Sequence, residues 1–104
     1  MTGSVEPPSV FAHVIVQGRV QGVGFRVFAA QAARRLELLG GVRNLEDGRR
    51  VELEVEGPKA LIEALLSELK IGPPAAEVSR IDTEWRTSTG QFSDFRIWYE
   101  HRPS

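Results

Sequence analysis

The sequence predicts an α+β fold in which two helices cover one face of an antiparallel sheet of four to five strands. Two observations lead to this prediction. Segments with strand-like and helix-like spacing of apolar residues follow one another in the order strand, helix, strand, strand, helix, strand, strand. Clusters of glycine and proline separate these segments, and the whole pattern fits within 104 residues, a length typical of one domain.

The first half of the chain predicts a strand, a helix and a hairpin. Residues 10–16 form an apolar, β-branched run typical of a strand. From Phe25 onward the apolar residues fall on one helical face, and we expect this helix to end near Leu39, with Gly40-Gly41 as its left-handed cap. Asp47-Gly48 then predicts the turn of a hairpin.

The most regular alternation in the chain follows this turn, at residues 50–56. Three apolar side chains point one way and three glutamates point the other way: Val51, Leu53 and Val55 against Glu52, Glu54 and Glu56. We expect a strand with one buried side and one solvent-facing side. The glutamates are then interpreted as a solvated face rather than as metal ligands.

A second helix and two strands complete the pattern. Gly57-Pro58 is expected to open the helix, with proline in its first turn, and residues 72–74, Gly-Pro-Pro, to end it. Residues 78–85 predict a strand with a bulge, and residues 95–99 alternate in a closing strand. The order of all these elements is that of a ferredoxin-like split βαβ sandwich.

We expect one domain flanked by two tails. Residues 1–9 are predicted to form a flexible N-terminal tail, residues 10–100 the domain, and residues 101–104 a short C-terminal tail. No apolar run has the roughly 18 residues that a membrane span needs, and the N-terminal tail lacks the apolar core of a secretory signal. The absence of cysteine excludes disulfides and thiolate metal sites. We therefore expect a cytoplasmic protein.

Charge is distributed unevenly along the chain, although the net charge is only −1. No acidic residue lies between Glu6 and Glu37, a stretch that contains Arg19, Arg26, Arg34 and Arg35. This first third is expected to hold an anionic ligand. The overall balance does not favour a nucleic-acid-binding protein, which usually has a strongly basic face. An RNA-binding domain of this fold would also need stacking aromatic residues on its central strands, where residues 50–56 place glutamates.

Residues 18–26, Gly-Arg-Val-Gln-Gly-Val-Gly-Phe-Arg, join the first predicted strand to the first predicted helix. Glycines allow successive N–H groups to point into one concavity, and the helix N-terminus adds further unpaired N–H groups. Arg26 lies in the first turn and can bind two phosphate oxygens through its forked guanidinium. The loop therefore suits a phosphate group, although spacing alone leaves open a glycine-rich connector with a solvated arginine.

The loop does not match the common nucleotide-binding loops. It lacks the Gly-Lys-Ser/Thr ending of a P-loop, and Val27 stands where a dinucleotide-binding loop has its third glycine. A nucleotide ligand is therefore disfavoured.

Two motifs resemble those of the acylphosphatase family. Residues 18–26 match the family pattern of glycine, any residue, valine-glutamine-glycine-valine, any residue, phenylalanine-arginine. Residues 40–44, Gly-Gly-Val-Arg-Asn, match a second family motif, and the resemblance covers about residues 10–100. It implies the ferredoxin-like fold and the metal-free hydrolysis of acyl phosphates to a carboxylate and inorganic phosphate.

The resemblance also implies which residues act. Arg26 and Asn44 are implied to be catalytic, with Asn44 positioning the attacking water. The phosphate-binding residues are implied to be Gln21, Gly22, Val23, Gly24, Phe25 and Arg26. No metal and no cofactor is implied. The expected partners are a small acyl phosphate and, as product-like ligands, phosphate or sulfate, with no nucleic acid and no membrane, and we expect a monomer.

Two positions depart from the family pattern. Glu37 stands where a glycine is common in the closing turn of the helix. Gly41 stands where a bulky residue often precedes valine-arginine-asparagine. Because Gly41 is close to Asn44 on the same predicted strand, we expect it to loosen that strand and weaken activity. Neither change removes a polar group that the chemistry requires.

The other notable polar and aromatic residues are interpreted as structural. His13 is expected to be a structural side chain of the first strand, and Arg43 to pair with an acid that the sequence does not identify. Asp47 is expected to serve turn geometry. For Trp85 and Trp98, packing on the faces of the sheet is favoured over an exposed contact patch.

Two alternatives to a free-standing enzyme stay open at this point. The same loop can bind phosphate or an acyl phosphate without turnover, as a binding module does. Acylphosphatase-like domains also occur at the front of a larger carbamoyl-transfer maturation protein of hydrogenases. Because no zinc finger or further domain is seen in this sequence, we expect a free-standing protein.

Overall fold

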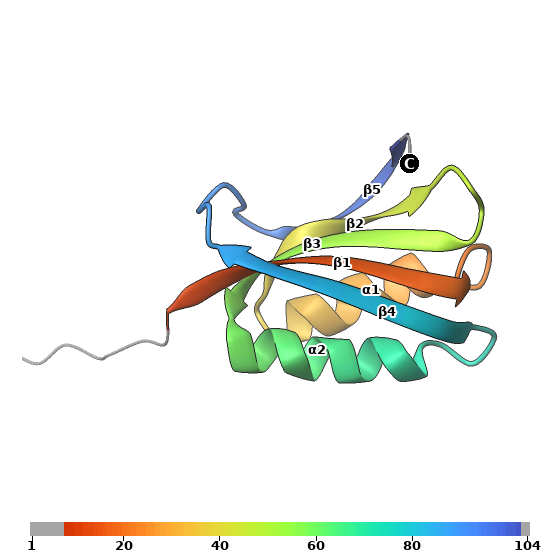
Figure 1. Ribbon diagram of the computed structural model, residues 1–104, viewed down its shortest axis with the longest axis horizontal. Coiled ribbons are helices and arrows are strands. Elements are labelled where there is room, and N and C mark those ends of the chain that lie inside the picture. The colour runs from red at the N-terminus through yellow and green to blue at the C-terminus, as the bar shows by residue number, and fades with distance from the viewer. Residues whose placement is uncertain (1–7, 103–104) are drawn as a thin grey trace, which may run out of the picture.

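The computed structural model describes residues 8–102. Five strands form one sheet in the order β4-β1-β3-β2-β5, and both helices pack on the same face of it (Figure 1). The predicted α+β class with two helices on one face is therefore confirmed. In chain order the elements are β1 (Ser9–Arg19), α1 (Phe25–Arg35), β2 (Leu39–Leu45), β3 (Arg50–Pro58), α2 (Lys59–Ile71), β4 (Glu77–Thr87) and β5 (Phe95–Arg102).

The sheet extends slightly beyond the predicted limits of the domain. β1 begins at Ser9 rather than at residue 10, and β5 continues to Arg102 rather than ending near residue 100. Residues 1–7 and 103–104 lie outside the described residues, so the predicted tails stay predictions.

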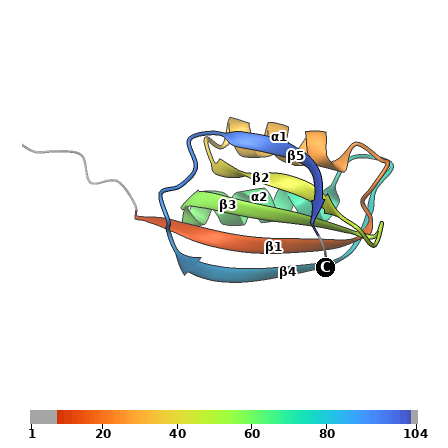
Figure 2. The same cartoon turned by 90° about the horizontal axis from the view of Figure 1, so that it is seen from above.

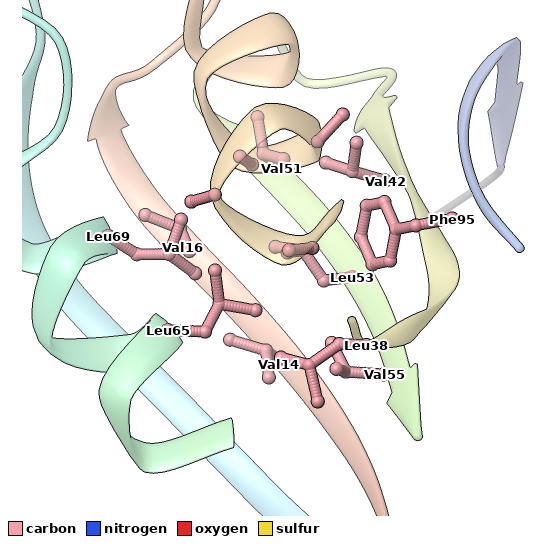
Figure 3. Close-up of a cluster of buried hydrophobic side chains, with 14 of the residues drawn as sticks. Val14, Val16, Leu38, Val42, Val51, Leu53, Val55, Leu65, Leu69 and Phe95 are labelled. Atoms are coloured by element: carbon pink, nitrogen blue, oxygen red, sulfur yellow. The ribbon is translucent and has the colours of Figure 1, made fainter. Parts of the chain in front are cut away.

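The hydrophobic core lies between the sheet and the two helices. Side chains of β1 and β3 that point toward the helices are fully buried, as are those that α2 turns toward the sheet (Figure 3). Each large aliphatic side chain buried in this way contributes about 1.5–3 kcal/mol. Alanines on the buried face of α1 bring that helix close to the sheet, namely Ala29, Ala30, Ala32 and Ala33. The core thereby fixes the strands and the helix on which the candidate site is built.

β5 differs from the other strands because it pairs with β2 in parallel (Figure 2). The remaining pairs are antiparallel, so the expectation of a wholly antiparallel sheet holds for four strands and not for the fifth. The linking residues 88–94 can span at most about 25 Å, and crossing the sheet from β4 to the far side of β2 uses about 19 Å of this length. The remainder is too short for the chain to run back along the strands. The chain therefore enters β5 at the end of the sheet where β4 finished, which is where β2 begins.

Two local expectations for the second half of the chain are met with small shifts. The bulge predicted in residues 78–85 is present, because Gln17 pairs with Arg80 and Gly18 with Val78, which leaves one extra residue on β4. Pro58 precedes α2 as its capping residue rather than lying within the first turn.

α1 ends earlier than predicted. Its last residue is Arg35 rather than one near Leu39, and the left-handed residue is Glu37, with a φ of 58°, rather than Gly40-Gly41. The Leu38 N–H donates to the carbonyl oxygen five residues earlier at 2.9 Å, which closes the helix in a Schellman motif. The earlier end allows Leu38 to enter the core, where it is 2% exposed.

The glutamates of β3 do not form a solvent-facing side, so this prediction was wrong. Glu52 is 5% exposed and Glu56 is 3% exposed. The reason is that β3 is the middle strand of the sheet, and its neighbours supply partners for the carboxylates. Glu56, for example, accepts hydrogen bonds from Thr89 and from the Gly90 N–H in the link before β5.

Replacing Glu37 by glycine is expected to stabilise the protein. The left-handed conformation costs a non-glycine residue about 1–2 kcal/mol, and the greater freedom of glycine in the unfolded chain offsets about 0.4–1 kcal/mol of the gain. We expect the free energy of unfolding, measured by urea denaturation, to rise by about 0.5–1 kcal/mol. The control Gln31→Gly, at an exposed position inside α1, should lower it by a similar amount. A loss of stability in Glu37→Gly would contradict the cap described above.

Candidate active site

The loop between β1 and α1 is shorter than the motif that predicted it. β1 runs through Arg19 and includes Gly18, so the loop itself comprises residues 20–24. Gly22 and Gly24 have φ values of 74° and 78°, in the left-handed region. Left-handed residues that alternate with ordinary ones turn successive N–H groups toward one concavity. The loop therefore has the backbone conformation of an anion-binding nest.

The N-terminus of α1 opens onto this loop. Gly24 caps the helix without a side-chain hydrogen bond, and the first turn contains no acidic residue. The first N–H groups of α1 thus have no side-chain acceptor, and the helix dipole gives this end a partial positive charge. A phosphate group is well suited to satisfy such a helix end.

Arg26 lies in the first turn of α1 and is half-buried. Its Cζ atom is 5.0 Å from the centroid of the Tyr99 ring, which comes from β5. Among the residues that the structure describes, no carboxylate lies within ion-pair distance of Arg26, whereas Arg35 on the same helix pairs with Glu68. The guanidinium of Arg26 is therefore available to an anion.

Asn44 lies near the end of β2, on the same side of the strand as the buried Val42. Its Oδ1 atom is buried and has no hydrogen-bond partner within residues 8–102. A buried acceptor without a partner costs about 1–3 kcal/mol. A water molecule or a ligand atom is therefore expected beside Oδ1.

A bulge in β5 lies directly opposite Asn44. Pairing between the two strands is regular up to Arg43, opposite Trp98, and resumes at Leu45, opposite Arg102. Three residues of β5 thus face one residue of β2, which bends β5 at this point. The bulge leaves Asn44 without a partner in the β2–β5 ladder, although it still pairs with Val51 of β3.

Gln21 acts through its side chain in a way that the motif did not indicate. Its Nε2 donates to the carbonyl oxygen of Leu45 at 2.8 Å and to that of Arg50 at 3.0 Å. These two acceptors lie on either side of the β2–β3 hairpin turn. The side chain thus ties the loop to the hairpin, while its backbone N–H stays in the loop. Sequence reasoning missed this role because both acceptors are backbone atoms, which leave no signal in the sequence.

Asp47 holds the hairpin turn, as its position predicted. Its Oδ1 accepts the N–H groups of Arg49 at 2.9 Å and of Arg50 at 3.1 Å. The Arg49 N–H, and after it the Arg50 side chain, lower the pKa of the Asp47 carboxyl below its ordinary value. The turn that receives Gln21 is therefore itself braced.

The loop, the N-terminus of α1 and the end of β2 come together at the end of the sheet where β1 finishes (Figure 2). Gln21 bonds to the residue after Asn44, and Arg26 lies over Tyr99 in the bulge opposite Asn44. Phe25 turns its side chain into the core and is 1% exposed, so it offers this site only its backbone. The arrangement can bind a phosphoryl group through N–H groups and a guanidinium while an amide oxygen holds a water beside it.

Arg43 points to the opposite face of the sheet from Asn44, where it contacts two carboxylates of β3. Its Nε is 3.5 Å from Glu52 Oε1 and its Nη2 is 3.7 Å from Glu54 Oε2. At these distances the contacts are ion pairs rather than hydrogen bonds. His13 Nε2 lies 2.7 Å from the other oxygen of Glu52. The structural roles expected for Arg43 and His13 agree with these contacts, and Glu52 is the acid that the sequence left unnamed.

Two further features of the described part of the chain bear on function. Residues 8–102 contain no group of three histidine, aspartate or glutamate side chains arranged to hold a metal ion. Neither α1 nor α2 is both long and apolar enough to cross a membrane.

Comparison with known proteins identifies the family. The family model described as Acylphosphatase matches residues 12–97. The chain belongs to the acylphosphatase family. The resemblance seen in residues 18–26 and 40–44 is thereby confirmed, together with the ferredoxin-like fold and a hydrolase acting on acid anhydrides.

Individual acylphosphatases match this chain over nearly their whole length. The acylphosphatase of Anaeromyxobacter dehalogenans is 50% identical over 88 residues, which cover 85% of this chain and 94% of that relative. The crystal structure of acylphosphatase from Bacillus subtilis superposes with a TM-score of 0.83 at 38% identity, covering 86% of this chain and 99% of that one.

This chain also matches one part of a larger protein. Full-length HypF in its phosphate- and nucleotide-bound form superposes with a TM-score of 0.85 at 31% identity, covering 98% of this chain but 13% of HypF.

Replacing Gln21 by glutamate is expected to detach the loop from the hairpin. A carboxylate cannot donate to the carbonyl oxygens of Leu45 and Arg50, and its charge also repels an incoming phosphate. We expect the free energy of unfolding to fall by about 1–3 kcal/mol and inorganic phosphate to bind more weakly, as measured by urea denaturation and NMR titration. Gln31→Glu, an exposed position on α1, adds the same charge and should change neither quantity. Equal behaviour of the two variants would show that Gln21 does not hold the loop.

Proposed function

We propose that this acylphosphatase hydrolyses small acyl phosphates, with the loop and Arg26 binding the phosphoryl group and Asn44 orienting the attacking water. The observation that carries the proposal is the Oδ1 atom of Asn44, a buried acceptor with no partner within residues 8–102. In-line attack on a phosphoryl group requires an oriented water beside an anion site. A buried acceptor opposite the β5 bulge, whose Tyr99 contacts Arg26, supports that reaction.

Phosphoryl binding is assigned to the backbone of residues 21–25 and to Arg26. The transition state of phosphoryl transfer is loose, and its charge spreads over the three equatorial oxygens. Backbone N–H groups and a forked guanidinium, already oriented before the substrate arrives, stabilise that charge without reorganising. In this proposal no metal or cofactor takes part.

The remaining chemistry needs little help because of the leaving group. The conjugate acid of a carboxylate has a pKa near 4, so the carboxylate departs without a proton and no general acid is required. The amide of Asn44 is too weak a base to remove the proton of the water. Its carbonyl oxygen instead holds the water in line, and the phosphate oxygens accept the proton.

We further propose the ligands and the oligomeric state of the protein. The substrate is a free small acyl phosphate, phosphate and sulfate are product-like ligands, and the protein acts as a monomer without nucleic acid. The net charge of −1 disfavours nucleic-acid binding, which usually relies on a strongly basic face. A cysteine-free composition suits the reducing cytoplasm that we expect for this chain.

Hydrolysis of acetyl or benzoyl phosphate in the presence of EDTA separates the enzyme from a binding module. In this assay Arg26→Ala is expected to lower kcat/KM by about 10²–10³-fold or more, as when a preorganised donor is removed. Arg26→Lys should recover little, because an ammonium group cannot form two parallel bonds to phosphate. Arg35→Ala, on the exposed side of the same helix, is the matched control and should keep wild-type activity. Binding of phosphate without any turnover by the wild type would instead support a binding module.

Asn44→Ala is expected to separate catalysis from binding. Removing the oxygen that holds the water should lower kcat by about 10²–10³-fold, whereas the affinity for inorganic phosphate should stay close to that of the wild type. The free energy of unfolding should not fall by the amount usual for a lost buried hydrogen bond, because Oδ1 makes none within the described residues. Gln91→Ala, an exposed amide in the link before β5, serves as control. Full activity of Asn44→Ala would end the water-orienting role.

A further inference from the structure

Trp98 occupies the space in which a side chain at position 41 would lie. Gly41 is buried in β2, and its φ is not in the left-handed region, so its backbone accepts any residue. A Cβ atom on Gly41 would nevertheless lie 2.3 Å from both Cε2 and Cζ2 of Trp98. The glycine is therefore required by the indole of β5 and not by the conformation of β2.

The same indole also contacts the residue before Asn44. The Cζ atom of Arg43 lies 4.2 Å from the centroid of the Trp98 ring. Phe92, in the link before β5, also packs against Trp98, with ring centroids 6.1 Å apart. Trp98 thus covers β2 from Gly41 to Arg43 on the face opposite the helices.

Arg43 is held from both neighbouring strands. On one side it pairs with Glu52 and Glu54 of β3, and on the other it lies against Trp98 of β5. Trp98 is also the last residue of β5 in regular register before the bulge at Asn44. The backbone of β2 is therefore held from both sides at Arg43, directly before the point where the regular pairing of β2 with β5 ends.

We propose that Trp98 is a positioning residue for Asn44. Its indole, seated on Gly41 and against Arg43, holds β2 to β5 and thereby sets the direction in which the Asn44 side chain leaves the strand. The inference rests on the proposed function of Asn44 for its catalytic consequence. It also implies that the glycine at position 41 does not loosen the strand, because β5 supplies the ring that covers it.

A kinetic cycle tests whether Trp98 acts through Asn44. Trp98→Ala is expected to lower kcat for acetyl phosphate by about 10–100-fold, as small misplacements of a reacting group do, with KM little changed. In an Asn44→Ala background the same substitution should have no further effect on kcat. An equal loss in both backgrounds would show a general structural role and overturn the proposal. Trp98→Phe, which keeps a ring in place, should show a smaller loss with the same pattern if Trp98→Ala does not fold.

A swap of the ring between strands provides the rescue. Gly41→Trp alone should be destabilised, because its Cβ meets the indole of Trp98. In the double variant Gly41→Trp/Trp98→Ala, an indole on β2 occupies the space left by Trp98, and most of the kcat lost in Trp98→Ala should be recovered. Trp85→Ala, which removes the other tryptophan from β4, is the matched control and should leave kcat unchanged. A folded double variant as slow as Trp98→Ala would contradict the proposal.

A readout without turnover keeps this inference separate from the proposed function. In NMR spectra, Trp98→Ala should shift the side-chain amide resonances of Asn44 and speed hydrogen exchange at residues 43–45, and the double variant should reverse both changes. If these changes occur in a protein without acyl phosphate turnover, the proposed function fails and the positioning role holds. Unchanged Asn44 resonances in Trp98→Ala would overturn the positioning role whatever the kinetics show.

Discussion

The Gln21 side chain joins the loop of residues 20–24 to the hairpin that carries Asn44, through hydrogen bonds to the carbonyl oxygens of Leu45 and Arg50. Because both acceptors flank the hairpin turn, Gln21 links the loop to both strands of the hairpin. Asp47 braces the same turn by accepting two backbone N–H groups. The separation between the anion nest and the amide of Asn44 is thus set by short, directional contacts between backbone and side chain. A site that binds a transition state without reorganising needs this kind of support.

Family membership and geometry together account for an enzyme with few functional groups. A carboxylate leaves without a proton, so the site needs charge stabilisation and an oriented water but no acid. Arg26 lacks a carboxylate partner within the described residues, whereas Arg35 and Arg43 have theirs. The Oδ1 atom of Asn44 has no partner within residues 8–102, which is a local cost in stability unless a water molecule or a ligand atom binds there. Groups arranged for a substrate rather than for the folded chain alone often carry such a cost.

The sequence predicted the order of the elements and the loop before α1, because periodicity and motif are local signals, whereas the roles of Arg26 and Asn44 stay predictions. It did not predict contacts made between distant segments. Alternation in residues 50–56 shows which side chains share a face, but Arg43, His13 and Thr89 decide that Glu52 and Glu56 are buried. Gly40-Gly41 resembles a helix cap, yet burial of Leu38 moves the cap to Glu37. The expectation that Gly41 loosens β2 did not take Trp98 into account, because this ring comes from a strand more than fifty residues later.

A crystal structure of the protein determined with phosphate would show whether the proposed site exists. We expect a phosphate in the nest of residues 21–25, with bonds from their N–H groups and two from Arg26. We also expect an ordered water that donates to Oδ1 of Asn44 and faces the phosphorus atom. A nest without phosphate at saturating concentration, or an Asn44 oxygen directed away from the phosphate, would rule out the proposed roles of the loop and of Asn44.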